Sequence, residues 1–261
     1  MNNFKTNIRQ AALPNEHGSW GFVLEPLILS LIVAYSLPGL LLAFCTFFMF
    51  LSHQPIKQLF KKKKNNPYKK ISIQFLIIYS TAIIILFAVI LSMVDINTLI
   101  PFVLSLIIML NYLIILYKQK NRELIFELSA PFSISLVALS ILLFNNWHID
   151  FVLAFWIILL ARSVPTTFYV RSKLLLIKKL SAKNFLPILL GLLFSIILLI
   201  TAALDYNPYL AAVASFILLI RAYYGLYVSK NKVKIRAFGI WEFIYGGLFI
   251  VITAVGYILN I

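Results

Sequence analysis

The feature that most constrains this chain is the regular alternation of long apolar runs with short polar breaks. Hydrophobic residues make up 62% of its 261 residues and charged residues only 12%, whereas a soluble domain carries about 25% charged residues. A soluble globule of this length could not bury so much apolar surface, so lipid is the expected solvent. Backbone in lipid must satisfy its own hydrogen bonds, and the runs are therefore predicted to be helices.

The apolar runs are close to the length of a transmembrane helix, since about 20 residues rising 1.5 Å each cross the hydrocarbon core. We predict an all-α, polytopic transmembrane helix bundle of about nine spans, with residues 1–19 as a short cytoplasmic segment and residues 20–261 as a single membrane domain. The predicted spans are Trp20–Tyr35, Pro38–His53, Ile71–Met93, Leu99–Tyr117, Leu124–Phe144, Asp150–Tyr169, Phe185–Leu204, Pro208–Val228 and Gly239–Leu259.

The charged residues predict which side of the membrane each break faces. All 23 Lys and Arg residues fall into five clusters, which occur at every second break, and the breaks between them carry Asp95, Asp150 and Asp205 instead. By the positive-inside rule the basic side is cytoplasmic, so the N-terminus is expected inside and the C-terminus outside. The lysine-rich run 57–70 is expected to bind anionic lipid headgroups and not nucleic acid, because it lies against a membrane surface.

Polar residues within the apolar runs are costly in lipid and therefore mark candidate sites. The most informative segment is ARSVPTTFYVRSKL, in which Arg162 lies nine residues before Arg171, about 13 Å of helix and hence inside the membrane. Its basic and hydroxyl side chains recur at i, i+4, i+7 and i+11 and so share one helix face, where they could bind phosphate, diphosphate or carboxylate. The candidate anion- and substrate-binding residues are Arg162, Thr166, Tyr169, Arg171, Lys173, Arg221 and Arg236.

The acidic residues leave a second interpretation of the buried arginines open. Glu25 lies inside the first run and is expected to face the bundle interior, either paired with a cation or protonated. Arg162 could therefore form a buried ion pair with Glu25, Glu127 or Glu242. Pro165 is expected to kink or loosen the helix near Arg162.

Candidate acid–base residues lie on the same side of the membrane. They are His17, His53, Glu25 and Glu242. The segment SHQP is expected to place His53 at a helix C-terminus. The single cysteine, Cys45, excludes an intramolecular disulfide and a thiolate metal cluster. The sequence predicts no metal site and identifies no cofactor.

Four segments resemble the YwiC-like family of bacterial integral membrane proteins. They are PNEHGSW, SHQP, RSVPTTFYVRSKL and IRAFGIWE, which follow one another across nearly the whole chain. The architecture is also similar, more distantly, to UbiA-type intramembrane prenyltransferases, which are N-inside bundles of nine helices with a cytoplasm-facing site. That likeness implies an isoprenoid or another anionic lipid-like ligand. The Asp-rich motifs that bind magnesium diphosphate in that family are missing, so Arg162, Arg171 and Lys173 would have to neutralise a phosphorylated lipid directly.

Three function classes are therefore compatible with the sequence. The first is a UbiA-like transferase or a lipid- or isoprenoid-binding protein with a cytoplasm-facing basic pocket. The second is a non-catalytic protein that assists assembly of a membrane complex, and the third is an anion transporter. All three place the chain as a multi-pass protein of the bacterial cytoplasmic membrane, in contact with membrane lipids and without nucleic acid, and leave open whether it is an enzyme.

Overall fold

The structure, a computed structural model, describes residues 12–14, 17–60, 68–118, 124–182, 184–229 and 235–261. For residues 17–19, 112–118, 124–126 and 235–236 it describes the backbone alone. Every regular element within these ranges is a helix, so the predicted all-α class is confirmed.

The helices follow the apolar runs of the sequence, one helix to each predicted span. The α-helices are α2 (His17–Val33), α3 (Leu37–Leu59), α4 (Lys69–Leu91), α5 (Ile100–Lys118), α6 (Leu124–Leu143), α7 (Ile149–Ile177), α8 (Phe185–Ala203), α9 (Tyr209–Tyr223) and α10 (Ile235–Leu259). A 3-10 turn, η1 (Ile96–Leu99), leads into α5, and a π-helix, η2 (Tyr224–Val228), continues α9.

Six of these helices are long and apolar enough to cross a membrane: α3, α4, α7, α8, α10 and α9 with its π-helical extension. The described parts of α2, α5 and α6 contain shorter apolar stretches. The chain is therefore a multi-pass membrane protein by length and composition of its helices, and the count of nine spans stays a prediction.

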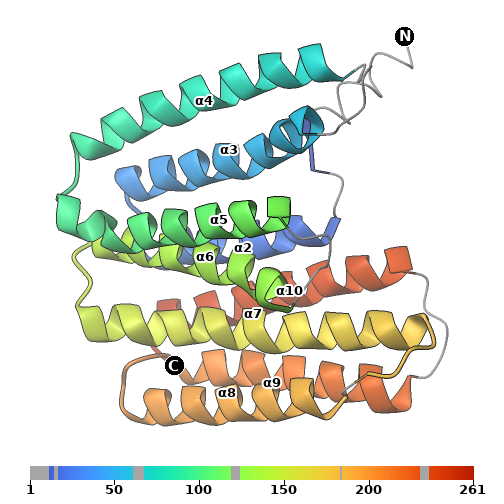
Figure 1. Cartoon of the computed structure of the whole chain (residues 1–261). Helices are drawn as coiled ribbons and strands as arrows, with labels where there is room; N and C mark the ends of the chain where they lie inside the picture. Colours follow the sequence, from blue (N-terminus) through green and yellow to red (C-terminus); the bar gives the residue numbers. More distant parts are fainter. Residues whose placement is uncertain (1–11, 15–16, 61–67, 119–123, 183, 230–234) are drawn as a thin grey trace.

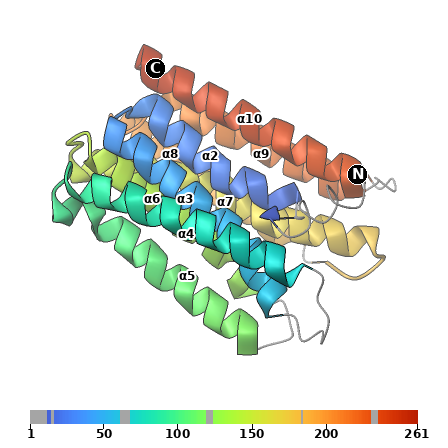
Figure 2. The same cartoon turned by 90° about the horizontal axis from the view of Figure 1, so that it is seen from above.

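Successive helices run in alternate directions along a common bundle (Figure 1). α2, α6 and α7 form its middle, with the pairs α3–α4 and α8–α9 on either side (Figure 1). α10 packs against α2 and α9 (Figure 2). Because direction alternates, Lys69 at the start of α4 and Lys178 after α7 lie at one end of the bundle. Asp95 and Asp150 lie at the opposite end, as the charge pattern predicts.

Two helices continue through a proline where the sequence suggested an interruption. α3 extends through Pro55 to Leu59, so the expectation that His53 lies at a helix C-terminus is wrong. α7 likewise runs unbroken past Pro165 to Ile177. A proline removes a single backbone bond, and a transmembrane helix tolerates that loss when neighbouring helices hold it in place.

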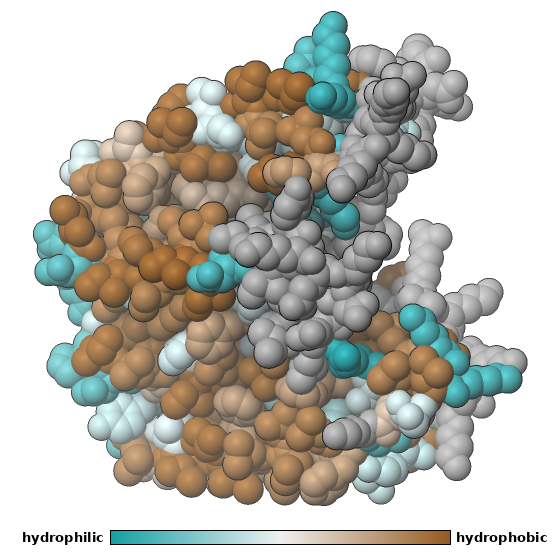
Figure 3. Space-filling view, viewed as in Figure 1, coloured by the Kyte–Doolittle hydropathy of each residue, from teal (hydrophilic) through white to brown (hydrophobic). Residues whose placement is uncertain are grey.

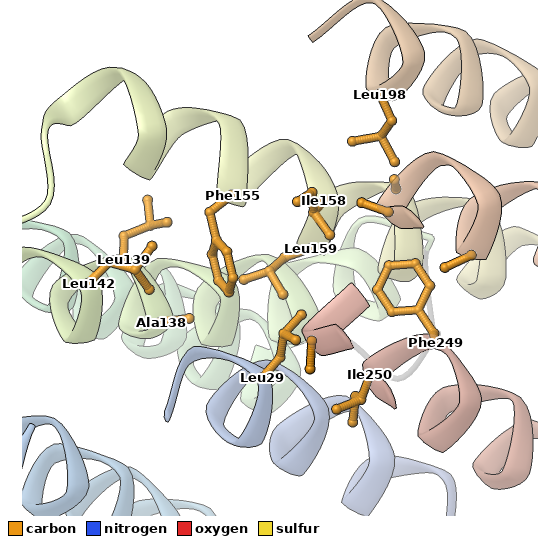
Figure 4. Close-up of a cluster of buried hydrophobic side chains, with 14 of the residues drawn as sticks. Leu29, Ala138, Leu139, Leu142, Phe155, Ile158, Leu159, Leu198, Phe249 and Ile250 are labelled. Carbon is orange, nitrogen blue, oxygen red and sulfur yellow. The ribbon is translucent and has the colours of Figure 1, made fainter. Parts of the chain in front are cut away.

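The largest hydrophobic core lies where α2, α6, α7, α9 and α10 meet, and Figure 4 shows Phe155, Leu159 and Phe249 among its side chains. Serine pairs let other helices approach closely, as Ser195 on α8 and Ser215 on α9 do at 2.8 Å, which is a common packing device in membranes. The outer surface is apolar over most of the face shown in Figure 3. That surface matches a lipid environment.

Candidate functional site

The centre of the bundle holds a buried ion pair between α7 and α2. The Arg162 Nη2 donates to Glu25 Oε1 at 3.0 Å, and its Nε lies 2.9 Å from Glu25 Oε2. The two side chains are only 7% and 10% exposed. This two-point geometry is the strong arrangement for an arginine and a carboxylate. Of the three carboxylates that the sequence left open as partners of Arg162, the structure places Glu25 on it.

A second ion pair lies beside the first, between α9 and α10. The Arg221 Nη1 donates to Glu242 Oε2 at 2.9 Å, with side chains 5% and 15% exposed. The guanidinium carbon of Arg221 stands 4.5 Å from the ring centroid of Tyr169 and 5.4 Å from that of Tyr245. Cation–π contacts of this kind are stronger when desolvated, so both rings help to fix the position of Arg221.

The hydroxyl of Thr166 joins the two pairs. Its Oγ1 accepts from Arg162 Nη1 at 2.6 Å and from Arg221 Nη2 at 3.4 Å. Arg162 also interacts electrostatically with Glu242. Two cations and two anions from four helices thus form one compensated layer, and we call Glu25, Arg162, Arg221 and Glu242, with Thr166, the charged layer. Buried charges are tolerated in this paired form.

Gly246 on α10 makes this arrangement sterically possible. A Cβ at this position would collide with the Glu25 carboxylate and would lie 2.8 Å from Arg162 Nη2. The missing side chain therefore lets the backbone of α10 cover the Arg162–Glu25 pair.

Two small cavities border the charged layer. One is lined by Glu25, Arg162 and Ser163 together with apolar residues, and the other by Thr166, Ser215 and Arg221 among others. Each holds about 10 Å³, roughly the room that one water molecule needs. In the conformation described, the layer is therefore closely packed.

Lys173 occupies a different place, one helix turn beyond Tyr169. Its Nζ donates to the carbonyls of Gly225 at 2.5 Å and Ser229 at 2.9 Å. These carbonyls belong to the π-helix η2 and the residue that follows it. A cation at a helix C-terminus is favoured by the helix dipole, so Lys173 stabilises the end of α9.

The predicted face of α7 is confirmed, since Arg162, Thr166, Tyr169 and Lys173 are all buried. Arg171 points elsewhere and pairs with Glu127 of α6 at 3.1 Å, with both side chains more than a third exposed. The structure thus groups Arg162, Thr166, Tyr169 and Arg221 with Glu25 and Glu242, and it separates Arg171 and Lys173 from them.

Three candidate residues stand apart from this group. The structure does not describe the side chains of His17 and Arg236. His53 is a half-buried residue of α3. Among the described residues, no group of three His, Cys, Asp or Glu side chains could hold a metal ion. Sequence reasoning missed Tyr245 as a partner of Arg221; its position one turn after Glu242 on α10 was the available signal.

A bundle of helices apolar enough to cross a membrane, with compensated charges in its interior, defines a polytopic integral membrane protein. The family model described as YwiC-like protein matches residues 13–142. The chain belongs to the YwiC-like family, as the PNEHGSW and SHQP segments within the matched range suggested. No curated protein matches the chain, and no solved structure matches it.

Proposed function

We propose that this protein binds an anionic, lipid-like molecule, such as an isoprenoid phosphate or an anionic lipid, from the cytoplasmic leaflet of the bacterial cell membrane. The observation that carries the proposal is the charged layer: buried arginines of two helices share one hydroxyl beneath the basic end of the bundle. Arginine on a desolvated site is well suited to phosphate or carboxylate recognition.

The position of the layer supports access from the basic end. Arg221 lies seven residues before Val228 at that end, about 10 Å of helix. Glu242 lies seven residues after Ile235, where α10 starts. A ligand with a charged head and an apolar tail could therefore reach Arg221 with its head while the tail stays in lipid.

The membrane orientation belongs to the same proposal. All nine α-helices of the described residues cross the bilayer, the lysine-rich end faces the cytoplasm and the C-terminus faces outward, by the positive-inside rule. An architecture like that of the UbiA-type prenyltransferases agrees with this orientation. This chain lacks the Asp-rich motifs of those enzymes, so its arginines, in place of magnesium, would balance the charge of the ligand.

A second function is favoured by one specific observation. Each buried arginine already has a carboxylate partner, and the adjacent cavities hold about 10 Å³ each. A packed, charge-compensated interior suits a non-catalytic membrane protein that assists assembly of a membrane complex. Buried ion pairs can specify how helices associate, beyond any net stabilisation.

Native mass spectrometry of the full chain, purified gently from a bacterial membrane, separates the two functions. The ligand-binding function predicts a retained anionic lipid or isoprenoid that is released when the charged layer is removed by replacing its two arginines and two glutamates with Met and Leu. Purification free of such a lipid, together with a stably associated protein subunit, would establish the assembly function in its place.

A further inference from the structure

The two buried arginines differ in how fully their donors are used. Arg162 engages both oxygens of Glu25 and gives a short bond of 2.6 Å to Thr166. Arg221 contacts one oxygen of Glu242, and its bond to Thr166 is long, at 3.4 Å. The Nε of both arginines is buried without a hydrogen bond, but the Nε of Arg162 lies 2.9 Å from Glu25 Oε2, whereas the Arg221–Glu242 ion pair is made through Nη1. A buried charged donor is costly when it is left unsatisfied, so Arg221 has capacity for a further acceptor.

A space of about 10 Å³, roughly the size of one water molecule, adjoins Arg221. The cavity that Arg221 lines is also lined by Ala161, Pro165 and Thr166. Pro165 has no backbone N–H, so it cannot donate to the carbonyl of Ala161 as an ordinary helical residue would. Polar residues of α7 and α9, among them Thr166, Ser215 and Arg221, therefore border this space.

The carboxylate that pairs with Arg221 is carried by a helix with two glycines that meet open space. Glu242 lies on α10 between Gly239 and Gly247, and a Cβ at either glycine would meet no atom within 4 Å. Packing therefore does not explain these glycines, and glycine within a helix makes that helix less stable than alanine would. Glu25, by contrast, is covered by the close approach of Gly246.

We infer that Arg221 is the exchange site of the charged layer: an incoming phosphate-type anion displaces Glu242 and takes its place on Arg221. The Arg162–Glu25 pair stays intact and supports the site. The rings of Tyr169 and Tyr245 hold the Arg221 guanidinium in position during the exchange. The inference rests on the proposed function and narrows it to one arginine and to the phosphate class of ligand, free or on a lipid.

Charge balance makes the exchange feasible in a buried site. When Glu242 moves toward the basic end, the phosphate oxygens replace its carboxylate as counterion, so the guanidinium never loses its partner. Phosphate also offers more acceptor oxygens than one carboxylate oxygen, and the free Nε of Arg221 can donate to one of them.

The test compares two charge-neutral double variants of the full chain in nanodiscs. One removes the second pair (Arg221→Met with Glu242→Leu), and the other removes the first pair (Arg162→Met with Glu25→Leu). Binding is measured by native mass spectrometry with phosphatidic acid in phosphatidylcholine nanodiscs, and with inorganic phosphate added to pure phosphatidylcholine nanodiscs. We expect the first variant to lose about tenfold or more in affinity for the phosphate group, equivalent to about 1.4 kcal/mol, and the second, which keeps Arg221, to lose less.

A further variant tests the movement of α10. Gly239→Ala with Gly247→Ala stiffens the helix that carries Glu242, and we expect weaker phosphate binding without a loss of thermal stability. Binding of phosphatidic acid alone places the phosphate on a lipid; equal, Arg221-dependent binding of inorganic phosphate supports the site and makes the free anion its ligand.

The experiment distinguishes a failure of the exchange site at Arg221 from a failure of the proposed ligand-binding function. If the unaltered protein binds phosphatidic acid but the Arg162–Glu25 variant loses it while the Arg221–Glu242 variant keeps it, the exchange site is misassigned and the proposed function stands. If the unaltered protein retains no anionic lipid from a membrane and binds neither probe, both are overturned.

Discussion

At the scale of single residues, the structure shows which polar side chains of the sequence pair with one another. Arg162, which is buried in the middle of α7, is compensated by Glu25 from a helix 137 positions away in the sequence. In a buried pair the removal of one partner is costly, because the other charge is left without compensation. The energetic role of each residue is therefore a property of the pair.

The first prediction concerns that pair. Arg162→Met alone should destabilise the protein by about 3 kcal/mol or more, because Glu25 is left buried and uncompensated. Adding Glu25→Leu should restore most of the lost stability, since an apolar pair of similar volume is often neutral or better. Thermal unfolding in detergent measures these two variants and Glu25→Leu alone. Additive losses in the double variant would show that the two side chains are not coupled.

The second prediction concerns the close approach of α10. Gly246→Ala should destabilise the bundle by about 3 kcal/mol, because its methyl group collides with the Glu25 carboxylate and disturbs a buried ion pair. The neighbouring Gly247→Ala is the matched control: it meets open space and should be neutral or stabilising by about 0.5 kcal/mol. Equal unfolding temperatures for the two variants would contradict the packing at Gly246.

At the scale of helices, the junction of α9 and η2 shows how a side chain from one helix ends another. The π-helix leaves backbone carbonyls that the regular i to i−4 pattern would not pair, and Lys173 from α7 donates to two of them. This contact ties the C-terminal half of α7 to the end of α9. It also explains how the charged side chain of Lys173 is buried in a contact that is made with backbone carbonyls and not with a carboxylate.

The third prediction follows from this contact. Lys173→Met should increase the rate of amide hydrogen exchange in Tyr224–Val228, because two charge-assisted bonds worth about 1.5–3 kcal/mol each are lost. Lys178→Met, an exposed residue beyond the same helix, serves as the control and should leave exchange in η2 unchanged. Unaltered exchange in both variants would show that the π-helix holds without Lys173.

At the scale of the whole molecule, alternating helix direction sorts the charges of the chain to two ends. Described basic residues at helix ends, such as Lys69 and Lys178, lie at one end, and Asp95 and Asp205 lie at the other. The charged layer sits between them, with the Arg162–Glu25 pair near the middle and the Arg221–Glu242 pair nearer to the basic end. Such polarity is what a protein inserted in one orientation requires.

The fourth prediction tests that orientation. In a Cys45→Ser background, which removes the single cysteine, Asp95→Cys should react with a membrane-impermeant maleimide on intact cells. Lys178→Cys should react only after the membrane is opened, because the proposed orientation places it on the cytoplasmic side. Labelling of both cysteines from outside would overturn the nine-span, N-inside topology, and with it the direction from which a ligand is proposed to enter.

The sequence alone determined the helices, because lipid requires internally bonded backbone and the length of each apolar run sets the length of its helix. It also determined that Arg162, Thr166, Tyr169 and Lys173 share a face, because helical periodicity is local. The continuation of α3 through Pro55 was not predicted, because the tertiary packing that lets a helix accommodate a proline cannot be inferred from the neighbouring residues in the sequence.

Only the tertiary structure decided which charges meet. Glu25, Glu127 and Glu242 were equal candidates for Arg162, and the choice among them depends on which helices are neighbours. The packing of α2 against α6 and α10, and of α7 against α6 and α9, placed Glu25 on Arg162 and left Glu242 for Arg221. Ion pairing acts over a few ångströms in space, whereas sequence patterns report on distances along one helix, and this difference is why the partners became visible only in the fold.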